Sequence, residues 1–280
     1  MRFRASDVAR ATSGRLVGPD VEIVGASFDS RSIEPGQLFV PIVAARDGHD
    51  FIAAAAASGA AATLASHDHA ATLPTVRVRD TGQALIDLAA WARRRLPAVV
   101  VGITGSVGKT TTKDLCVAAI ATGRRVGANP RSFNNEQGLP VTVLGAPDDL
   151  EVLVLEMGMR GLGEIARLCV VGRPDIGVVT AVAAAHTGRL GGIDGVVRAK
   201  GELVEALPST GTAILNTDDP RVAAMAGRTD AAVLTFGFGA SADVRVDDVQ
   251  LDDLARARFT ARTPWGAAEV QLPVSGRHMA

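Results

Sequence analysis

The stretch GITGSVGKTTTKDL, residues 102–115, decides the fold class of this 280-residue chain. It follows an apolar run and passes through two glycines into Lys-Thr-Thr, a pattern that predicts a strand, a glycine turn and a helix starting near Lys109. In such a turn, backbone N–H groups converge on a phosphate, a lysine ammonium adds positive charge, and a threonine hydroxyl can ligate Mg²⁺. We therefore predict a phosphate-binding loop, with Lys109 at the β- and γ-phosphates of a nucleotide and Thr110 at the metal.

The glycine spacing of this loop is shortened. The common form has four residues between its first glycine and the Gly-Lys pair, whereas Gly105 lies only three positions before Gly108. The alternative interpretation is a glycine-rich turn from strand to helix that binds no ligand. Because Lys-Thr-Thr follows the turn at once, we favour the phosphate-binding loop.

Composition and charge exclude several classes of protein. The chain carries 29 basic and 30 acidic residues and has no basic block, so nucleic acid is not expected as a partner. The two cysteines, Cys116 and Cys169, have apolar neighbours, and we expect buried thiols in a reducing compartment. The start of the chain lacks the apolar core of a signal peptide, and the alanine-rich run at 51–66 is too short to span a bilayer. We therefore expect a cytoplasmic protein without membrane insertion.

The chain divides into two predicted domains. Residues 1–97 mix short apolar runs with an alanine-rich helix near 50–59 and end in a helix over 81–96, which predicts a small mixed α/β domain. Residues 98–280 alternate apolar strands with helical segments, the pattern of a mainly parallel sheet that is buried on both faces. The expected elements there are strands at 98–104, 150–157, 175–182 and 212–216, helices at 109–122, 163–171 and 193–206, and an antiparallel extension after residue 239. The fold class is α/β, and site residues are expected beyond the carboxyl ends of the parallel strands.

The second of these strands ends in Glu156. A carboxylate is costly to bury at the end of an apolar strand unless a cation or a hydrogen-bond donor faces it. Beside a phosphate-binding loop the natural partner is Mg²⁺. The alternative is an acidic residue that favours the N-terminus of the next helix.

The third and fourth strand ends carry weaker signals. His186 follows the third strand, where a lone histidine is commonly a packing residue, and Lys200 lies in a helical segment, where the alternative is a surface lysine. Asn216 at the end of the fourth strand and Asp219 after it could bond an adenine edge or a ribose, or cap a helix before Pro220. Together with the loop and Glu156, these residues form a constellation at successive strand ends.

The constellation resembles the Mur ligase family, ATP-dependent amide ligases that build the peptide stem of bacterial cell-wall precursors. The shortened loop of residues 104–111 is the form that these ligases share with folylpolyglutamate synthases, and the resemblance extends over essentially the whole chain. It implies ATP and two Mg²⁺ ions as cofactors. The ATP-binding residues that it implies are Thr104, Gly105, Ser106, Val107, Gly108, Lys109, Thr110 and Thr111, and the expected set also includes Asn216 and Asp219 from the fourth strand end.

Within the family, three stretches resemble the ligase that joins D-alanyl-D-alanine to UDP-N-acetylmuramoyl-tripeptide. They are SFNNEQGLPVTVL (132–144), EMGMRGLGEIARL (156–168) and AAAHTGRLGGIDGVVRAKGEL (183–203). The resemblance implies that ATP phosphorylates the tripeptide carboxylate and that the dipeptide amine then displaces phosphate. The alternatives are the sibling ligase that adds the third stem amino acid, or a nucleotide-binding module without catalysis.

The resemblance also implies roles for individual residues. Thr110 and Glu156 match metal-binding positions, and His186 matches a ligand of the second Mg²⁺. Lys200 matches a lysine that several relatives carry as a carbamate, and Lys109, His186 and Lys200 are the expected catalytic residues. The expected substrate contacts are Asp29, Ser30 and Arg31 near the UDP group, and Asn134 and Asn135 near the peptide or the phosphates. The family usually has an Ala-Leu-x-Gly run where this chain has PIVAAR, residues 41–46.

The chain stops shortly after GRH, residues 276–278. Members of the family continue from such a motif into a further helix and a C-terminal domain that binds the incoming amino component. From this resemblance we expect a monomer that alone binds nucleotide weakly and does not ligate.

Overall fold

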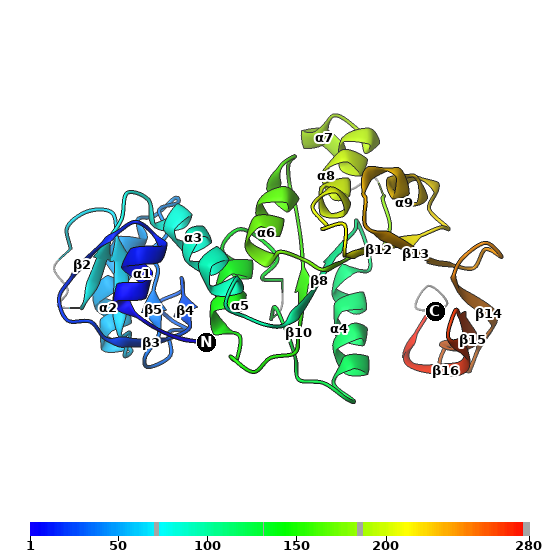
Figure 1. Cartoon of the computed structure of the whole chain (residues 1–280), viewed down its shortest axis with the longest axis horizontal. Coiled ribbons are helices and arrows are strands. Elements are labelled where there is room, and N and C mark those ends of the chain that lie inside the picture. The colour runs from blue at the N-terminus through cyan, green and yellow to red at the C-terminus, as the bar shows by residue number, and fades with distance from the viewer. Residues whose placement is uncertain (70–72, 131, 184–186, 277–280) are drawn as a thin grey trace.

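The computed structural model describes all residues except 70–72, 131, 184–186 and 277–280. The described residues form a two-stranded pair, a five-stranded sheet near the N-terminus and a nine-stranded sheet. Figure 1 shows these parts in a row, with the five-stranded sheet at the left, helices α3 (Thr81–Arg93) and α5 (Gly138–Gly145) in the middle, and the nine-stranded sheet at the right. The predicted α/β class is confirmed.

The five-stranded sheet has the order β2-β7-β6-β5-β4, in which the β2–β7 pair is antiparallel and the other three pairs are parallel. Its elements are β2 (Arg15–Val17), β4 (Ala26–Ser27), β5 (Leu38–Phe39), β6 (Ala62–Ala65) and β7 (Thr75–Arg77), with helices α1 (Ala5–Ala11), η1 (Gly48–Phe51) and α2 (Ile52–Ala57). Residues 21–28, VEIVGASF, are an apolar run that the structure divides into two strands. It breaks at Gly25, whose φ is 72°, so that β3 (Glu22–Val24) pairs with β1 (Arg2–Arg4) while β4 joins the larger sheet.

The nine-stranded sheet has the order β16-β15-β14-β13-β12-β11-β8-β10-β9. Its strands are β8 (Val99–Thr104), β9 (Val126–Ala128), β10 (Val152–Glu156), β11 (Ile176–Val179), β12 (Thr212–Asn216), β13 (Ala232–Gly237), β14 (Val244–Leu251), β15 (Arg256–Thr263) and β16 (Gly266–Ser275). Strands β8 to β13 are parallel, and β14, β15 and β16 form the predicted antiparallel extension. Because β8 lies between β10 and β11, its carboxyl end is a topological switch point, where open parallel sheets bind ligands.

The helices of this part follow the predicted pattern. They are α4 (Lys109–Ile120), α5, α6 (Glu164–Gly172), α7 (Thr187–Leu190), α8 (Ile193–Glu205), α9 (Pro220–Ala223) and η2 (Ala224–Arg228). The predicted helices at 109–122, 163–171 and 193–206 correspond to α4, α6 and α8. The four predicted parallel strands correspond to β8, β10, β11 and β12.

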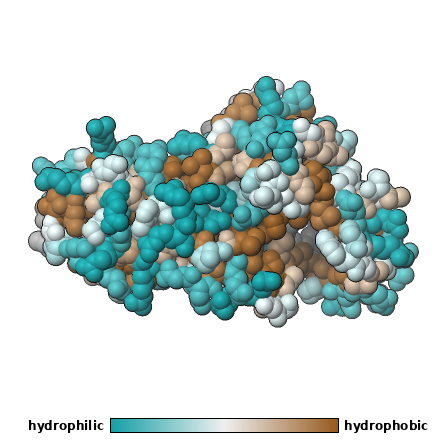
Figure 2. Space-filling model, viewed as in Figure 1, coloured by the Kyte–Doolittle hydropathy of each residue, from teal (hydrophilic) through white to brown (hydrophobic). Residues whose placement is uncertain are grey.

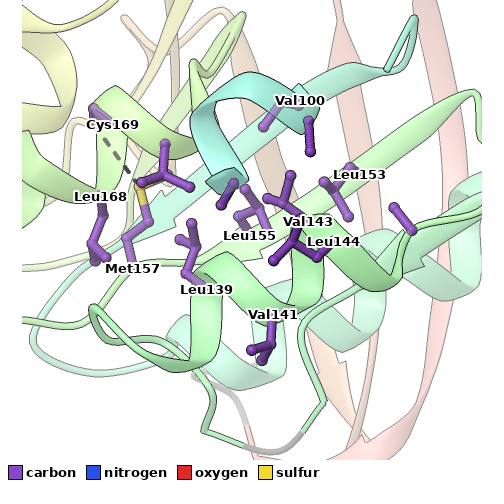
Figure 3. Packing of buried hydrophobic residues seen from close by; sticks show 14 of the residues in the cluster. Val100, Leu139, Val141, Val143, Leu144, Leu153, Leu155, Met157, Leu168 and Cys169 are labelled. Atoms are coloured by element: carbon purple, nitrogen blue, oxygen red, sulfur yellow. Dashed lines mark hydrogen bonds between the residues drawn. The ribbon is translucent and has the colours of Figure 1, made fainter. Parts of the chain in front are cut away.

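Helix α5 was not expected from the sequence, because GLPVTVLG is rich in β-branched residues and contains a proline. Six of its eight residues are buried, and Pro140 lies in the first turn, where no intrahelical N–H bond is lost. Figure 3 shows Leu139 and Val143 of this helix directed toward Leu155 of β10. A helix that is apolar on all sides belongs in a core, and its burial here outweighs its weak helix propensity.

One continuous hydrophobic core joins the two large sheets. It includes Phe3 of β1, Leu88 of α3, Leu144 of α5 and Leu215 of β12. Helices α3 and α5 therefore bury apolar faces between the two parts of the chain. The domain boundary predicted at Pro97 falls between α3 and β8, and the division into domains stays a prediction.

The surface and the cysteines bear on the remaining expectations. Figure 2 shows polar residues over most of the N-terminal part, with hydrophobic patches nearer the middle of the molecule. Among the described residues, no helix combines the length and the apolar character needed to cross a membrane.

Cys169 is a buried free thiol as expected, whereas Cys116 is only partly buried.

Candidate functional site

The turn after β8 requires its glycines. Gly105 has φ 155°, and a Cβ at this position would lie 1.9 Å from the hydroxyl oxygen of Thr180. Gly108 has φ 82° and is the N-cap of α4, which begins at Lys109. The turn therefore aims the positive end of the α4 dipole and the first backbone N–H groups of this helix at the edge of the sheet, where an anion can bind.

The loop is held against the end of β11, and its lysine is held against the loop. The Ser106 N–H donates to the Ala181 carbonyl at 2.7 Å. The Lys109 ammonium donates to the carbonyl of Gly105 at 2.9 Å, so it lies over the turn where a phosphate would meet it. Phosphate binding at this turn stays a prediction, because the bond between Lys109 and Gly105 would also suit a turn without a ligand.

Not every residue of the predicted ATP set faces the ligand side of the loop. Thr104 is fully buried, and its hydroxyl donates to the carbonyl of Met157 at 2.9 Å. Val107 is 59% exposed, and Thr111 lies half-buried in the first turn of α4. The side chain of Thr104 thus fastens β8 to the segment after β10 and leaves contacts with a nucleotide to the backbone and to the residues that follow.

Glu156 and Thr110, predicted to share a metal, lie in direct contact. The Thr110 hydroxyl donates to Glu156 Oε2 at 2.7 Å, and the Asn134 side-chain amide donates to Glu156 Oε1 at 2.7 Å. Glu156 is 2% exposed, whereas Thr110 is exposed at the start of α4. The parallel pairing of β8 with β10 causes this meeting, because it brings the end of the second strand beside the phosphate-binding loop.

A cavity of about 540 Å³ lies beside this network, beyond the ends of β8 and β10. Residues from four segments line it, among them Gly105, Lys109, Asn134, Asn135 and Lys200. The structure therefore brings the loop lysine, both asparagines and the distant Lys200 to one cavity. Asn135 holds its own turn, because its Oδ1 accepts from the N–H groups at positions 137 and 138 at 3.1 and 2.8 Å.

Lys200 is not the surface lysine that its helix alone would suggest. It lies on the buried face of α8 and is 4% exposed. Burial first, and the positive charge of Lys109 second, lower the pKa of Lys200 from 10.5 to about 7. Lysine in such a position has a substantial uncharged fraction at neutral pH and can react as an amine.

Two polar residues, one at the end of β12 and one just after it, hold the loop that follows β11. The Asn216 amide donates to the Thr180 carbonyl at 2.8 Å, and Asp219 accepts from the Val182 N–H at 2.7 Å. Asp219 is also the N-cap of α9, as its alternative interpretation predicted. Their contact with adenine stays a prediction, and His186 lies outside the described residues.

A second cavity, of about 390 Å³, lies between the N-terminal part and the nine-stranded sheet. Asp29 and Phe28 line it from one side and Phe133 from the other, and the two aromatic rings lie 5.6 Å apart between centroids at 40°. Arg31 donates to Asp29 at 2.8 and 2.9 Å, which lowers the pKa of Asp29. Ser30 and Arg31 adjoin this cavity in sequence but do not line it.

Asp47, His49 and His67 also have ligand atoms within 4.8 Å of one another, among the residues that the structure describes. His49 Nε2 accepts from the Ser66 N–H at 3.0 Å, so its hydrogen is on Nδ1, which donates to Asp47 at 2.6 Å. A metal on Nδ1 would force a hydrogen onto Nε2, directly against the Ser66 N–H. We therefore interpret the group as a hydrogen-bonded cluster that fastens η1 to the end of β6.

Asn129 and Lys113 were not expected from the sequence to belong to the site, yet both are buried beside Glu156. Asn129 bonds Glu156 through its side-chain amide, and Lys113 donates to the carbonyl of Asn129 at 3.1 Å. A signal was present for the lysine, which follows Thr110 by three residues and so shares its helix face. The asparagine gives no comparable local signal.

The glycine turn, the lysine and threonine at the start of α4, and the acidic strand end define a P-loop nucleotide-binding α/β protein. The family model of the Mur ligase middle domain matches residues 103–280, and the chain belongs to the Mur ligase family.

One curated relative and two solved structures show which members of the family this chain is similar to. The UDP-N-acetylmuramoyl-tripeptide--D-alanyl-D-alanine ligase of Mycobacterium tuberculosis (strain ATCC 25618 / H37Rv) is 42% identical over 274 residues, which cover 90% of this chain and 54% of the relative. A crystal structure of MurF from Acinetobacter baumannii has a TM-score of 0.91 at 29% identity, and the match covers 99% of this chain and 62% of the MurF chain. MurF from Thermotoga maritima in complex with ADP has a TM-score of 0.79 at 29% identity, and the match covers 91% of this chain and 60% of that MurF chain. The chain thus spans about half the length of the curated relative.

Proposed function

We propose that this chain serves an ATP-dependent ligase that joins D-alanyl-D-alanine to UDP-N-acetylmuramoyl-tripeptide, in the cytoplasmic synthesis of peptidoglycan precursors. The observation that carries the proposal is the contact of Thr110 with Glu156 beside the loop lysine, next to the cavity that Lys200 lines. The name of the Mycobacterium tuberculosis relative supports the choice of substrates. The sibling ligase that adds the third stem residue has less support, because the relative bears the name of the dipeptide-adding activity.

The proposed reaction has two steps. A carboxylate oxygen of the tripeptide attacks the γ-phosphorus of ATP, and the bond from this phosphorus to the bridging oxygen breaks. ADP departs, and the tripeptide carries an acyl phosphate. The dipeptide amine then attacks the acyl carbon and loses a proton, and inorganic phosphate leaves as the amide forms. Because a carboxylate and a triphosphate repel each other, the protein must neutralise charge and align the groups. Lys109 and the loop N–H groups do this at the phosphates.

The surroundings of Glu156 fit a divalent cation. Its carboxylate is buried, and its two side-chain partners, the Thr110 hydroxyl and the Asn134 amide, are neutral. A buried carboxylate that bonds no cation in the described part of the chain is costly, and Mg²⁺ prefers oxygen ligands of this kind. We propose Thr110 and Glu156 as ligands of Mg²⁺, which when bound would stabilise charge on the transferring phosphoryl group.

A second Mg²⁺ is proposed at Lys200 and His186. An amine that reacts with carbon dioxide must be uncharged, and it yields a carbamate and a proton. The lowered pKa of Lys200 provides the uncharged form near pH 7. A carbamate is an anionic oxygen donor, whereas an ammonium cannot ligate Mg²⁺.

The remaining assignments concern the substrates and the units of the chain. We propose that the 390 Å³ cavity holds the uridine nucleotide near Asp29, Ser30 and Arg31, and that Asn134 and Asn135 lie near the muramoyl-peptide or the phosphates. For the adenine or ribose we propose Asn216 and Asp219. The proposed domains are 1–97 for the UDP-linked substrate and 98–280 for ATP, in a monomer.

The test is amide formation by the purified chain with ATP, Mg²⁺, UDP-N-acetylmuramoyl-tripeptide and D-alanyl-D-alanine. Binding of ADP and of the tripeptide precursor is measured by calorimetry in parallel. We expect both ligands to bind, and we expect Lys109→Met to weaken ADP binding by about tenfold or more, the order lost when one charged partner of a phosphate is removed. Failure to bind either ligand would refute the proposal. Amide formation would support the ligase directly, whereas binding of both without amide formation agrees with the expectation that this chain alone does not ligate and leaves the non-catalytic module as the alternative.

A further inference from the structure

Asn129 lies directly after β9, is 1% exposed, and continues the ladder between β9 and β10 with its side chain. The backbone pairing of these strands ends at Ala128 opposite Val154. Beyond that pair, Asn129 Oδ1 accepts from the Glu156 N–H at 2.8 Å, and Asn129 Nδ2 donates to the Glu156 carbonyl at 3.1 Å. One side-chain amide thus binds both backbone polar groups of Glu156.

The same amide ties Glu156 to the loop that carries Asn134. Asn129 Nδ2 also donates to the Phe133 carbonyl at 3.0 Å. The side-chain amide of Asn134, which follows Phe133, donates to Glu156 Oε1 at 2.7 Å. An asparagine amide has two donor hydrogens and an acceptor oxygen, and all three functions are used here. The opposite orientation of the amide would set its oxygen against two carbonyls, so the network fixes the orientation.

Helix α4 supports this arrangement from the other side. The Lys113 ammonium donates to the backbone carbonyl of Asn129 at 3.1 Å, and its side chain is 6% exposed. Thr110, three residues earlier on the same helix face, donates to the other carboxylate oxygen of Glu156. The ends of β9 and β10 and the first turns of α4 therefore meet in one network at the Glu156 carboxylate.

We propose that Asn129 is a positioning residue for the metal-binding carboxylate of Glu156. It fixes the backbone from which the carboxylate projects, and it fixes the turn from which Asn134 reaches that carboxylate. Groups that orient a metal ligand without touching the metal change metal affinity by about 10- to 100-fold when they are replaced. The inference rests on the proposed function, because it takes Glu156 as a ligand of Mg²⁺ with bound nucleotide.

The test measures the affinity of the full chain for ADP by calorimetry, once with excess Mg²⁺ and once with EDTA. The ratio of the two dissociation constants is the Mg²⁺-dependent gain. Asn129→Asp keeps the side-chain size and the acceptor for the Glu156 N–H but sets an oxygen against two carbonyls, and Asn129→Ala removes all three bonds. Thr63→Val is the matched control, because Thr63 is buried in β6, bonds backbone carbonyls and lines neither cavity.

Both Asn129 variants are expected to lower the Mg²⁺-dependent gain by about tenfold or more, with less than about a twofold change in EDTA. Thr63→Val should alter neither affinity. An unchanged Mg²⁺-dependent gain in the folded variants would overturn the inference. A merely structural asparagine would give this result, because its replacement would lower the affinity for ADP equally with and without Mg²⁺ or not at all.

Thermal unfolding shows whether each variant is folded. If neither Asn129 variant folds, Lys113→Met carries the same comparison with Asn129 intact, and an unchanged gain there counts against the inference. A wild-type chain that binds no ADP would refute the proposed function itself. A wild-type chain that binds ADP without a gain from Mg²⁺ would refute the positioning role while leaving nucleotide binding in place.

Discussion

Two lysines on one cavity have different chemistry because of where they lie. Lys109 stands at the N-terminus of α4 and donates to a loop carbonyl, in the position of a charged phosphate partner. Lys200 projects from the buried face of α8, and its pKa is lowered to about 7 by burial and by Lys109. Residue type alone does not distinguish them, whereas the depth of burial does.

Lys200→Met is expected to stabilise the protein, and by more at pH 7 than at pH 10. Because the pKa of Lys200 falls from 10.5 to about 7 on folding, the unfolded chain binds its proton more tightly. The resulting penalty is full below pH 7 and disappears as the pH rises toward 10.5. Methionine removes the penalty. The free energy of unfolding of the variant should therefore exceed that of the wild type by more than about 1 kcal/mol at pH 7, since one pKa unit corresponds to about 1.4 kcal/mol.

Urea unfolding of both proteins in buffer free of carbon dioxide, at pH 7 and at pH 10, measures this difference. Carbon dioxide is excluded so that the free amine is compared with methionine. A difference between wild type and variant that is the same at the two pH values would contradict the assignment of a lowered pKa to Lys200.

Among the elements, those with strong local patterns were predictable from the sequence. Continuous apolar runs gave β8, β10, β11 and β12, and helical spacing gave α4, α6 and α8. Helix α5 was not predictable, because its form depends on burial against α3 and α6 and not on its own residues. The split of the run at 21–28 depended on a positive φ at Gly25 that the alternation of side chains does not reveal.

The candidate site was likewise predictable only in part, namely for the residues that a local sequence pattern places at or after a strand end. Lys109 and Thr110 follow the end of β8 and Glu156 ends β10, and parallel pairing brings such strand ends together. Asn129 was not predictable, because its bond to Glu156 spans 27 positions and depends on the register of β9 against β10. Contacts that depend on register between distant strands leave no periodic signal in the sequence.

Helices α6 and α8, which both line the 540 Å³ cavity, are joined by a cap that one supplies to the other. Helix α6 has Gly163 as its N-cap and no side-chain cap of its own. Glu202 of α8 accepts from the N–H groups of Gly163 at 2.7 Å and Ala166 at 3.0 Å. These are orphan donors of a helix N-terminus, where a negative charge is also favoured.

Glu202→Ala is expected to lower the free energy of unfolding by about 1 to 2 kcal/mol, the upper part of the range for loss of a helix cap. The measurement is chemical denaturation at pH 7. Glu269→Ala is the control, because Glu269 is exposed and pairs with the exposed Arg258, so its loss should cost less than about 1 kcal/mol. Equal losses in the two variants would mean that Glu202 acts as an ordinary surface charge.

Over the whole molecule, one loop connects the two cavities. Phe133 lines the 390 Å³ cavity and packs against Phe28 of the N-terminal part. Asn134, the next residue, lines the 540 Å³ cavity and bonds the Glu156 carboxylate. A ligand that fixes Phe133 therefore also fixes the backbone that aims Asn134, so the ordering cost of this segment is met once for two ligands.

Binding in the two cavities is accordingly expected to be cooperative. Saturating UDP, used as the probe of the smaller cavity, should lower the dissociation constant of ADP with Mg²⁺ by about fivefold or more, and ADP should tighten UDP by the same factor. Phe133→Ala should reduce this factor to less than about twofold, because it cuts the link at the loop while leaving the residues around Glu156 in place. Phe51→Ala is the control, since Phe51 is 37% exposed and lines neither cavity. Calorimetric titrations of each ligand with and without the other decide the matter, and a coupling factor that survives in Phe133→Ala, or disappears in Phe51→Ala, would place the connection between the cavities elsewhere in the fold.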